Sequence, residues 1–138
     1  MIVCVLTVVL SGIVQPAAAG DEWTWENPLP QGNTLWGVWG AARDEVYAVG
    51  GMGSVLRYNG TDWLVTANLV DDILQDVWGA APDDIYAVTS DAEFYHFDGA
   101  TWSLQYDHDG YTADLWGRSA NEIYAVGGRI WLTLSWHM

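Results

Sequence analysis

The side chains that could do acid–base chemistry in this chain are mostly carboxylates, and they occur in pairs. Asp44-Glu45 and Asp83-Asp84 stand at the same place in two similar stretches of sequence, and Asn121-Glu122 stands there in a third, with an amide in place of the first acid. A catalytic carboxylate pair is needed once, with its two pKa values separated by different surroundings. A pair that recurs in every stretch is therefore interpreted as turn chemistry, in which Asp and Asn side chains bond to nearby backbone groups.

One polar cluster, Asp107-His108-Asp109-Gly110, has no counterpart elsewhere in the chain. Carboxylates at Asp107 and Asp109 followed by a glycine suggest part of a Ca²⁺-binding loop. A complete loop needs later oxygen ligands and a bidentate Glu, and only Asp114 is near. We expect an ordinary connecting loop, and Ca²⁺ at Asp107 and Asp109 is the one metal site that the sequence suggests; no other cofactor is expected.

Other arrangements that carry catalysis are missing from the sequence. His96, His108 and His137 are isolated and form no metal-ligand spacing. We find no Ser-His-Asp arrangement, no phosphate-binding glycine loop and no dinucleotide fingerprint. The sequence predicts a non-catalytic protein, and an extracellular hydrolase is kept as a second alternative.

The charge of the chain restricts its partners. Among 138 residues, 4 Lys and Arg stand against 18 Asp and Glu, which gives a formal net charge of -14. Such a chain repels the phosphate backbone of nucleic acids and an anionic lipid surface. A hydrophobic fraction of 51% also argues against disorder driven by low hydrophobicity. Protein and glycan partners remain.

The first nineteen residues are typical of a secretory signal peptide. An apolar run, Ile2 to Val14, predicts the helical h-region; Gln15-Pro16 ends it, and Ala17-Ala18-Ala19 offers an A-x-A cleavage site. The run is shorter than the ~18–20 apolar residues of a membrane span. We expect cleavage after Ala19, no stable membrane insertion afterwards, and a secreted, periplasmic or cell-surface location. A buried N-terminal strand is the alternative.

An internal repeat organises the remainder. Trp39-Gly40, Trp78-Gly79 and Trp116-Gly117 each precede a turn and a Tyr-Ala-Val segment, and the copies lie 39 and then 38 residues apart. Repeats of this length indicate a fold built from stacked supersecondary units. The repeat therefore predicts the architecture before any single element is assigned.

Each full copy reads as four short strands. The first copy has the Trp-Gly segment 35–40, the apolar segment 46–49, the segment 55–58 and a last strand from Trp63, and the second copy repeats this order. Asn59-Gly60 and Asp98-Gly99 predict hairpins in which both turn residues have positive φ. The paired indole and glycine predict a Trp between neighbouring units, where Gly allows close approach of the backbone.

A unit of ~40 residues with four strands is typical of a β-propeller blade. We predict an all-β chain in which residues 20–138 form a partial propeller of about two and a half blades, approximately 34–68, 73–107 and 112–138, after the signal peptide 1–19. Trp23 to Asn27 resembles a fourth strand without its blade. A fragment of a longer protein, a homo-oligomer that completes a ring and a short open stack all stay open.

The Trp-Gly and Tyr-Ala-Val-Gly pattern resembles the repeats of secreted bacterial β-propeller proteins, similar to kelch-like and sialidase-type repeats. The resemblance implies an exported propeller used for binding or assembly. Of the sialidase Asp-box, Ser-x-Asp-x-Gly-x-Thr-Trp, this chain keeps Gly99, Thr101 and Trp102 but lacks the Ser, and its acid falls directly before the Gly. That departure argues against a glycosidase.

We therefore expect a non-catalytic binding or scaffold protein whose protein or glycan partner the sequence does not name. A lectin-like, carbohydrate-binding module is the first alternative, because Trp side chains stack on sugar rings. Six of the ten Trp residues fall on repeat-equivalent positions that packing explains. Of the others, Trp23 and Trp36 are the candidate ligand-binding residues.

Cleavage of the signal peptide is directly testable. When the full chain is expressed in a secreting bacterial host, we expect the exported form to begin at Gly20 and to lack Cys4, the single cysteine. Intact-mass spectrometry of the exported protein measures this. A mass that retains the first nineteen residues would contradict the prediction.

Overall fold

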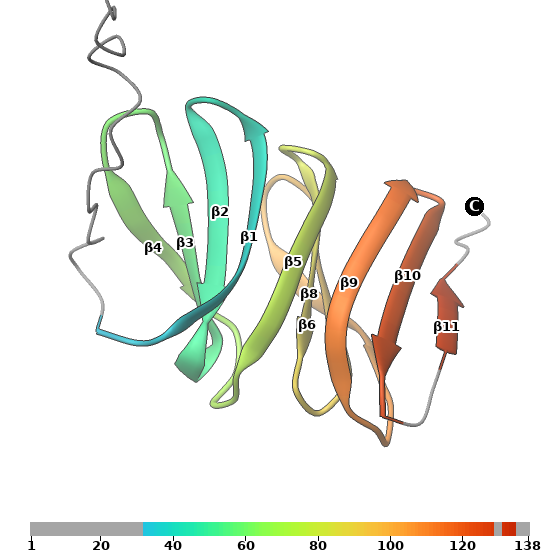
Figure 1. Ribbon diagram of the computed structural model, residues 1–138. Helices are drawn as coiled ribbons and strands as arrows, with labels where there is room; N and C mark the ends of the chain where they lie inside the picture. The colour runs from blue at the N-terminus through green and yellow to red at the C-terminus, as the bar shows by residue number, and fades with distance from the viewer. Residues whose placement is uncertain (1–31, 129–130, 135–138) are drawn as a thin grey trace, which may run out of the picture.

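The computed structural model describes residues 32–128 and 131–134, and within them every regular element is a strand except one short 3₁₀ turn. The strands form three antiparallel sheets, each in sequence order (Figure 1). The first sheet contains β1 (Leu35–Ala42), β2 (Glu45–Gly50), β3 (Ser54–Tyr58) and β4 (Trp63–Asn68), with the 3₁₀ turn η1 (Gly51–Gly53) between β2 and β3. The second contains β5 (Leu74–Ala81), β6 (Asp84–Thr89), β7 (Glu93–Phe97) and β8 (Trp102–Asp107). The third contains β9 (Thr112–Ser119), β10 (Glu122–Gly127) and β11 (Trp131–Leu134). The predicted all-β class is confirmed.

The hairpins at one end of the sheets correct the predicted turn type. Of each Asn-Gly or Asp-Gly pair only the glycine has positive φ, 92° at Gly60 and 88° at Gly99. The side-chain oxygen of Asn59 instead accepts hydrogen bonds from the backbone N–H groups of Thr61 and Asp62, at 3.0 and 2.9 Å. Asp98 accepts equivalent bonds from Ala100 and Thr101. The loops are therefore four-residue Asx turns rather than two-residue turns, because the side chain takes over backbone donors.

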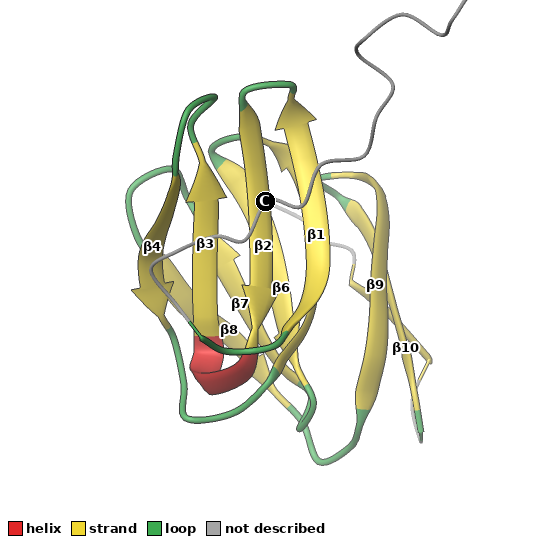
Figure 2. Ribbon diagram, turned by 60° about the vertical axis from the view of Figure 1, so that its left-hand side comes forward, coloured by secondary structure: helices red, strands yellow, loops and turns green. Residues whose placement is uncertain are grey.

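The β3–β4 turn lies against the β1–β2 turn, and the β7–β8 turn lies against the β5–β6 turn. A Cβ atom on Gly60 would stand 2.9 Å from the Cβ of Asp44, and one on Gly99 would stand 2.8 Å from that of Asp83. These four turns, together with the β9–β10 turn, form one end of the molecule, which we call the hairpin end (Figure 2).

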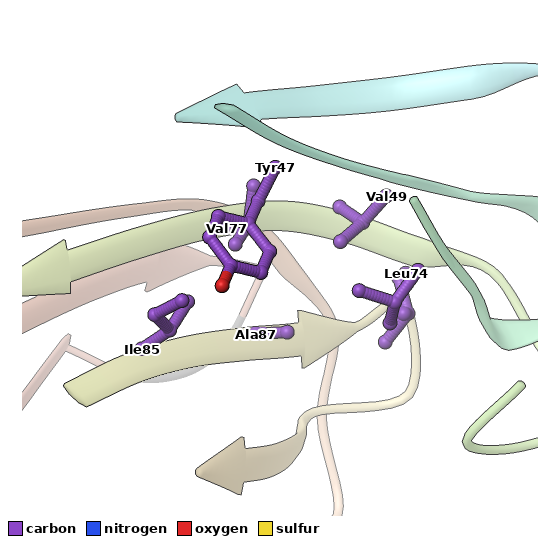
Figure 3. Packing of buried hydrophobic residues seen from close by; sticks show 7 residues of the cluster. Tyr47, Val49, Leu74, Val77, Ile85 and Ala87 are labelled. Atoms are coloured by element: carbon purple, nitrogen blue, oxygen red, sulfur yellow. The ribbon is translucent and has the colours of Figure 1, made fainter. Parts of the chain in front are cut away.

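The three sheets stack face to face, and their inward faces make two hydrophobic clusters. Figure 3 shows Tyr47 and Val49 of β2 pointing toward side chains of β5 and β6. The cluster between the first and second sheets is formed by Tyr47, Val49, Val55, Leu74, Val77, Ile85 and Ala87. The cluster between the second and third is formed by Tyr86, Val88, Phe94, Leu115, Ile123 and Ala125. Each pair of neighbouring sheets thus buries an apolar cluster between its facing surfaces.

The first strands β1, β5 and β9 hold the sheets closest together, as Figure 1 shows. The indole of Trp39 lies over Gly79 of the second sheet, where an added Cβ would come within 2.5 Å of the ring. The indole of Trp78 lies over Gly117 of the third sheet in the same way, at 2.6 Å. The predicted role of the Trp-Gly pair, an indole between sheets with glycine beneath it, is confirmed.

Two expectations concern residues outside this description. The signal peptide 1–19 and the strand expected at 23–27 lie outside the described residues and stay predictions. Within the described part of the chain, no helix has the length and apolar character required to cross a bilayer.

The indole-on-glycine contact predicts a position-dependent cost for a single methyl group. We expect Gly117→Ala to lower the free energy of unfolding by about 1–3 kcal/mol, because the methyl overpacks against the ring of Trp78. Gly40→Ala is the matched control, since the nearest atom to an added Cβ there is 3.6 Å away. Urea denaturation of both variants at low protein concentration measures the difference, and equal losses would contradict this reading.

Candidate functional site

Two repeat-related clefts open between the sheets toward the hairpin end. The first cleft, between the first and second sheets, has a volume of about 340 Å³ and is lined by Glu45, Tyr47, Arg57, Thr66, Pro82, Asp83, Phe97, Gly99, Ala100 and Trp102. The second cleft, between the second and third sheets, has a volume of about 370 Å³ and is lined by Asp83, Asp84, Tyr86, His96, Asp98, Gln105, Ala120 and Asn121. Glu45, Tyr47, Arg57 and Thr66 of the first cleft have lining counterparts 39 residues later in the second, and Pro82 and Asp83 have theirs 38 residues later, at Ala120 and Asn121.

An ion pair forms one wall of the first cleft. The Arg57 guanidinium donates to both carboxylate oxygens of Glu45, at 2.7 and 2.8 Å. This bidentate hydrogen bond from Arg57 is the largest cause that holds the pKa of Glu45 below its ordinary value of 4.5, and burial opposes it. The charge of Arg57 is therefore already balanced inside the cleft.

Tyr47 connects this wall to the neighbouring sheet. Its hydroxyl donates to Glu45 at 3.0 Å and lies 3.4 Å from the carbonyl oxygen of Pro82 across the cleft. Burial and then the Glu45 carboxylate raise the pKa of Tyr47 to about 12, so the phenol stays protonated as a hydrogen-bond donor. The facing wall carries the rings of Phe97 and Trp102, which are tilted toward each other with their centroids 5.3 Å apart. The first cleft thus combines a neutralised ion pair with an aromatic wall.

The second cleft keeps this plan but exchanges the charged groups. His96 takes the place of Arg57 and lies 2.8 Å from the carboxylate of Asp84, which takes the place of Glu45. The imidazole also stacks on the ring of Tyr86, with centroids 4.5 Å apart. Burial, followed by the negative charge of Asp84, raises the pKa of Tyr86 to about 12. With Asp83 and Asp98 also on its wall, this cleft is the more negative of the two.

The His96–Asp84 pair does not form a hydrolytic triad with the one hydroxyl nearby. Ser103 lies opposite His96 in the strand register. Its hydroxyl donates to the backbone carbonyl of His96 at 3.5 Å and accepts from the Gln105 amide at 2.7 Å. No hydrogen bond found among the described residues joins that hydroxyl to the imidazole, which a nucleophile–base pair requires. Ser103 and His96 are therefore not arranged as a nucleophile and its base.

A separate carboxyl pair joins the first strands of the second and third sheets. One Asp76 oxygen accepts the backbone N–H of Leu115 at 2.9 Å, across the sheet interface. Burial first, and then a hydrogen bond with the Asp114 side chain, raise the pKa of Asp76 to about 6. Neither cleft is lined by these two residues, so the pair serves the contact between sheets.

The structure places the suggested metal ligands at the opposite end from the clefts. Asp107 ends β8 and Asp109 lies in the loop before β9, and both are exposed. The His108 ring lies 2.9 Å from the carbonyl oxygen of Asp109. The described residues contain no group of three or more His, Cys, Asp or Glu side chains able to hold an ion. Ca²⁺ at Asp107 and Asp109 stays a prediction.

The two candidate ligand-binding tryptophans differ in what is known of them. Trp36 lies on β1 with 56% of its surface exposed, whereas Trp23 lies outside the described residues. Trp36 is not among the residues that line either cleft. A sugar-binding role for these residues stays a prediction.

Sequence analysis missed the clefts. The acids at Glu45 and Asp84 were interpreted only as turn formers, and His96 as isolated. In fact the second residue of each acidic pair begins a strand and faces the third strand, where Arg57 or His96 pairs with it. A sequence pattern that could have predicted the clefts occurs in both full copies. In each copy an acid is followed by a Tyr two residues later and by a basic side chain ten residues after that Tyr.

Comparisons with known proteins place the fold. No family model and no curated protein matches this chain. Its structure is similar to that of YCF48 bound to D1 peptide, with a TM-score of 0.64 and 16% identity, and to that of YCF48 from Cyanidioschyzon merolae, with a TM-score of 0.60 and 20% identity. Each match covers 78% of this chain, which spans 42% and 38% of those chains.

Similarity at these identities shows the fold, and the chain is an incomplete β-propeller with its sheets as blades. The expected partial propeller is confirmed. The kelch-like or sialidase-type character of the repeat and its bacterial origin stay predictions.

The ion pair of the first cleft predicts an acid-dependent loss of stability. Because the folded pKa of Glu45 lies below 4.5, its contribution is complete above that value and disappears as the pH falls through the folded pKa. We expect Glu45→Gln to lower the free energy of unfolding by about 0.5–1 kcal/mol at neutral pH, a modest figure because the Arg57 side chain is 45% exposed.

The measurement is a double-mutant cycle of Glu45→Gln and Arg57→Leu by urea denaturation at several pH values. The coupling energy between the two positions should shrink on acidification. A coupling that is independent of pH would contradict the assignment.

Proposed function

We propose that this chain is an exported, non-catalytic binding protein that holds an extended segment of a protein partner across its hairpin end. The observation that carries this proposal is the recurrence of the cleft. Two cavities of similar size and plan lie side by side at one end of the stack, and Asp83 lines both. Consecutive binding positions of this kind suit a ligand that is itself repetitive, as a polypeptide is.

The lining of the clefts supports a peptide better than a compact small molecule. The first cleft offers an aromatic wall and an ion pair, and the second offers carboxylates and an imidazole. Pockets that combine apolar surface with a few directed polar groups take single side chains of a partner. One structural neighbour is described as YCF48 bound to D1 peptide, which supports a peptide ligand for the present chain as well.

The charge of the chain favours a basic partner. The formal net charge of -14 attracts cationic surfaces over long distances and raises the rate of encounter. The second cleft carries Asp83, Asp84 and Asp98, which suits a Lys or Arg side chain of the bound segment. In the first cleft the charges of Glu45 and Arg57 neutralise each other, so this cleft suits an uncharged or aromatic side chain of the partner.

The absence of catalysis and the exported location are parts of the same proposal. The described histidine–carboxylate pair has no hydroxyl nucleophile bonded to its ring, as the bonds of Ser103 show. The signal peptide expected at residues 1–19 supports a secreted, periplasmic or cell-surface location.

Carbohydrate binding is the second candidate. The observation in its favour is Trp36, a large aromatic side chain with 56% of its surface exposed on the first strand of the first sheet. An exposed indole offers a flat apolar face on which a sugar ring can stack. The two candidates use different surfaces, so they can be separated experimentally.

Filling the clefts tests the peptide proposal. An array of short basic and aromatic peptides is the probe, read out by fluorescence of the labelled protein. We expect Ala100→Trp to block the first cleft and Ala120→Trp to block the second, each lowering the affinity of the peptides retained by the wild type at least ten-fold. Thr61→Trp is the matched control, because Thr61 occupies the position of Ala100 in the first sheet but lines neither cleft.

Equal loss in the control and the two cleft variants would rule out binding in the clefts. A glycan array provides the other arm of the test. Retention of glycans that is lost in Trp36→Ala, together with no retention of peptides, would replace the proposal with carbohydrate binding.

A further inference from the structure

The third sheet exposes the residues with which the first two sheets hold their neighbours. Trp116 is 58% exposed, whereas the equivalent Trp39 and Trp78 are covered by the following sheet. Val126 is 37% exposed, whereas its equivalents Val49 and Val88 are fully buried. Trp116 and Val126 lie on the same face, since Trp116 pairs with Tyr124 and Asp114 pairs with Val126 in the strand register.

The first sheet exposes the complementary surface. Gly40 precedes its turn as Gly79 and Gly117 do, but the nearest described atom to an added Cβ at Gly40 is 3.6 Å away, so no indole of a described residue covers it. Val38 is 68% exposed, whereas its equivalents Val77 and Leu115 are 3% and 4% exposed. Ala48 and Leu56 on that face are buried, so the open part is confined to the first strand. This is the strand through which neighbouring sheets make their closest contact.

We propose that a second copy of this chain docks head to tail, with Trp116 of one copy over Gly40 of the other. The occupant is indicated by continuity with the two interfaces inside the chain, which use the same residue types in the same places. The contact would cover Val38 of one copy and the Trp116 indole of the other, as Val77 and the Trp78 indole are covered now.

A head-to-tail contact between identical chains closes into a ring when the rotation permits and otherwise extends. Every copy offers the same two surfaces, so each contact in such an assembly is identical to the next.

The test is the mass of the full exported chain in solution, measured by sedimentation velocity over a range of concentrations. We expect an assembly of two or more copies, whose formation Trp116→Ser and Gly40→Ala each weaken at least ten-fold. Leu104→Ser is the matched control, since it removes an apolar side chain of similar exposure, 48%, from the outer strand β8. Gly40→Ala has room for its methyl group within one copy, so its fold should be unchanged in circular dichroism and thermal unfolding.

Mixing the two variants gives the decisive result. A chain with Trp116→Ser keeps its Gly40, and a chain with Gly40→Ala keeps its Trp116, so a head-to-tail contact forms between them. We expect the mixture to associate more tightly than either variant alone. A monomeric wild type would overturn the proposal, and so would an assembly that neither substitution weakens or whose weakened variants do not rescue each other.

Discussion

The contact between an indole and the glycine of the next sheet is the interaction on which the structure depends. A sheet of four strands has two faces and cannot bury both alone. In this chain the faces are brought together at the first strands, where Trp39 lies over Gly79 and Trp78 over Gly117. Each indole ring removes a large apolar area from water, which stabilises the fold by about 25 cal/mol per Å². Because glycine has no side chain, the ring can approach the backbone of the neighbouring sheet. Any larger residue would push the sheets apart and expose the clusters behind them.

The clefts are a consequence of the same packing. The sheets are held closest at β1, β5 and β9, and the clefts are bordered by residues of the later strands and of the turns. Because Tyr47 and Tyr86 stand between the buried clusters and these openings, each serves two purposes. The ring belongs to the apolar packing between sheets, and the hydroxyl lies in the cleft beside an acid. The geometry that stabilises the stack therefore also sets the depth of the candidate binding surface.

Much of this fold could be predicted from the sequence, because the repeat fixes which residues are equivalent. Residue types alone predict the four-strand pattern, the buried second strand and the position of the Trp-Gly pair. The turn type could not be predicted. A two-residue turn requires Asn59 to adopt a positive φ, whereas an Asx turn requires its side-chain oxygen to accept backbone N–H groups, and Asn can do either. The clefts were missed for a similar reason: Glu45 and Arg57 meet only once the register of β2 and β3 is known.

The repeat also separates the positions that hold the stack from those that can vary. Trp39 and Trp78 are identical, as are Gly79 and Gly117 beneath them, because the spacing between the sheets leaves no room for a side chain under the indole. The cleft positions differ between copies: Arg57 becomes His96, and Thr66 becomes Gln105. A substitution in a cleft changes the charge and size of a binding position without altering the contact between sheets. Under the proposed function, two clefts of one plan would recognise two different side chains of the same ligand, which a strictly identical repeat could not do.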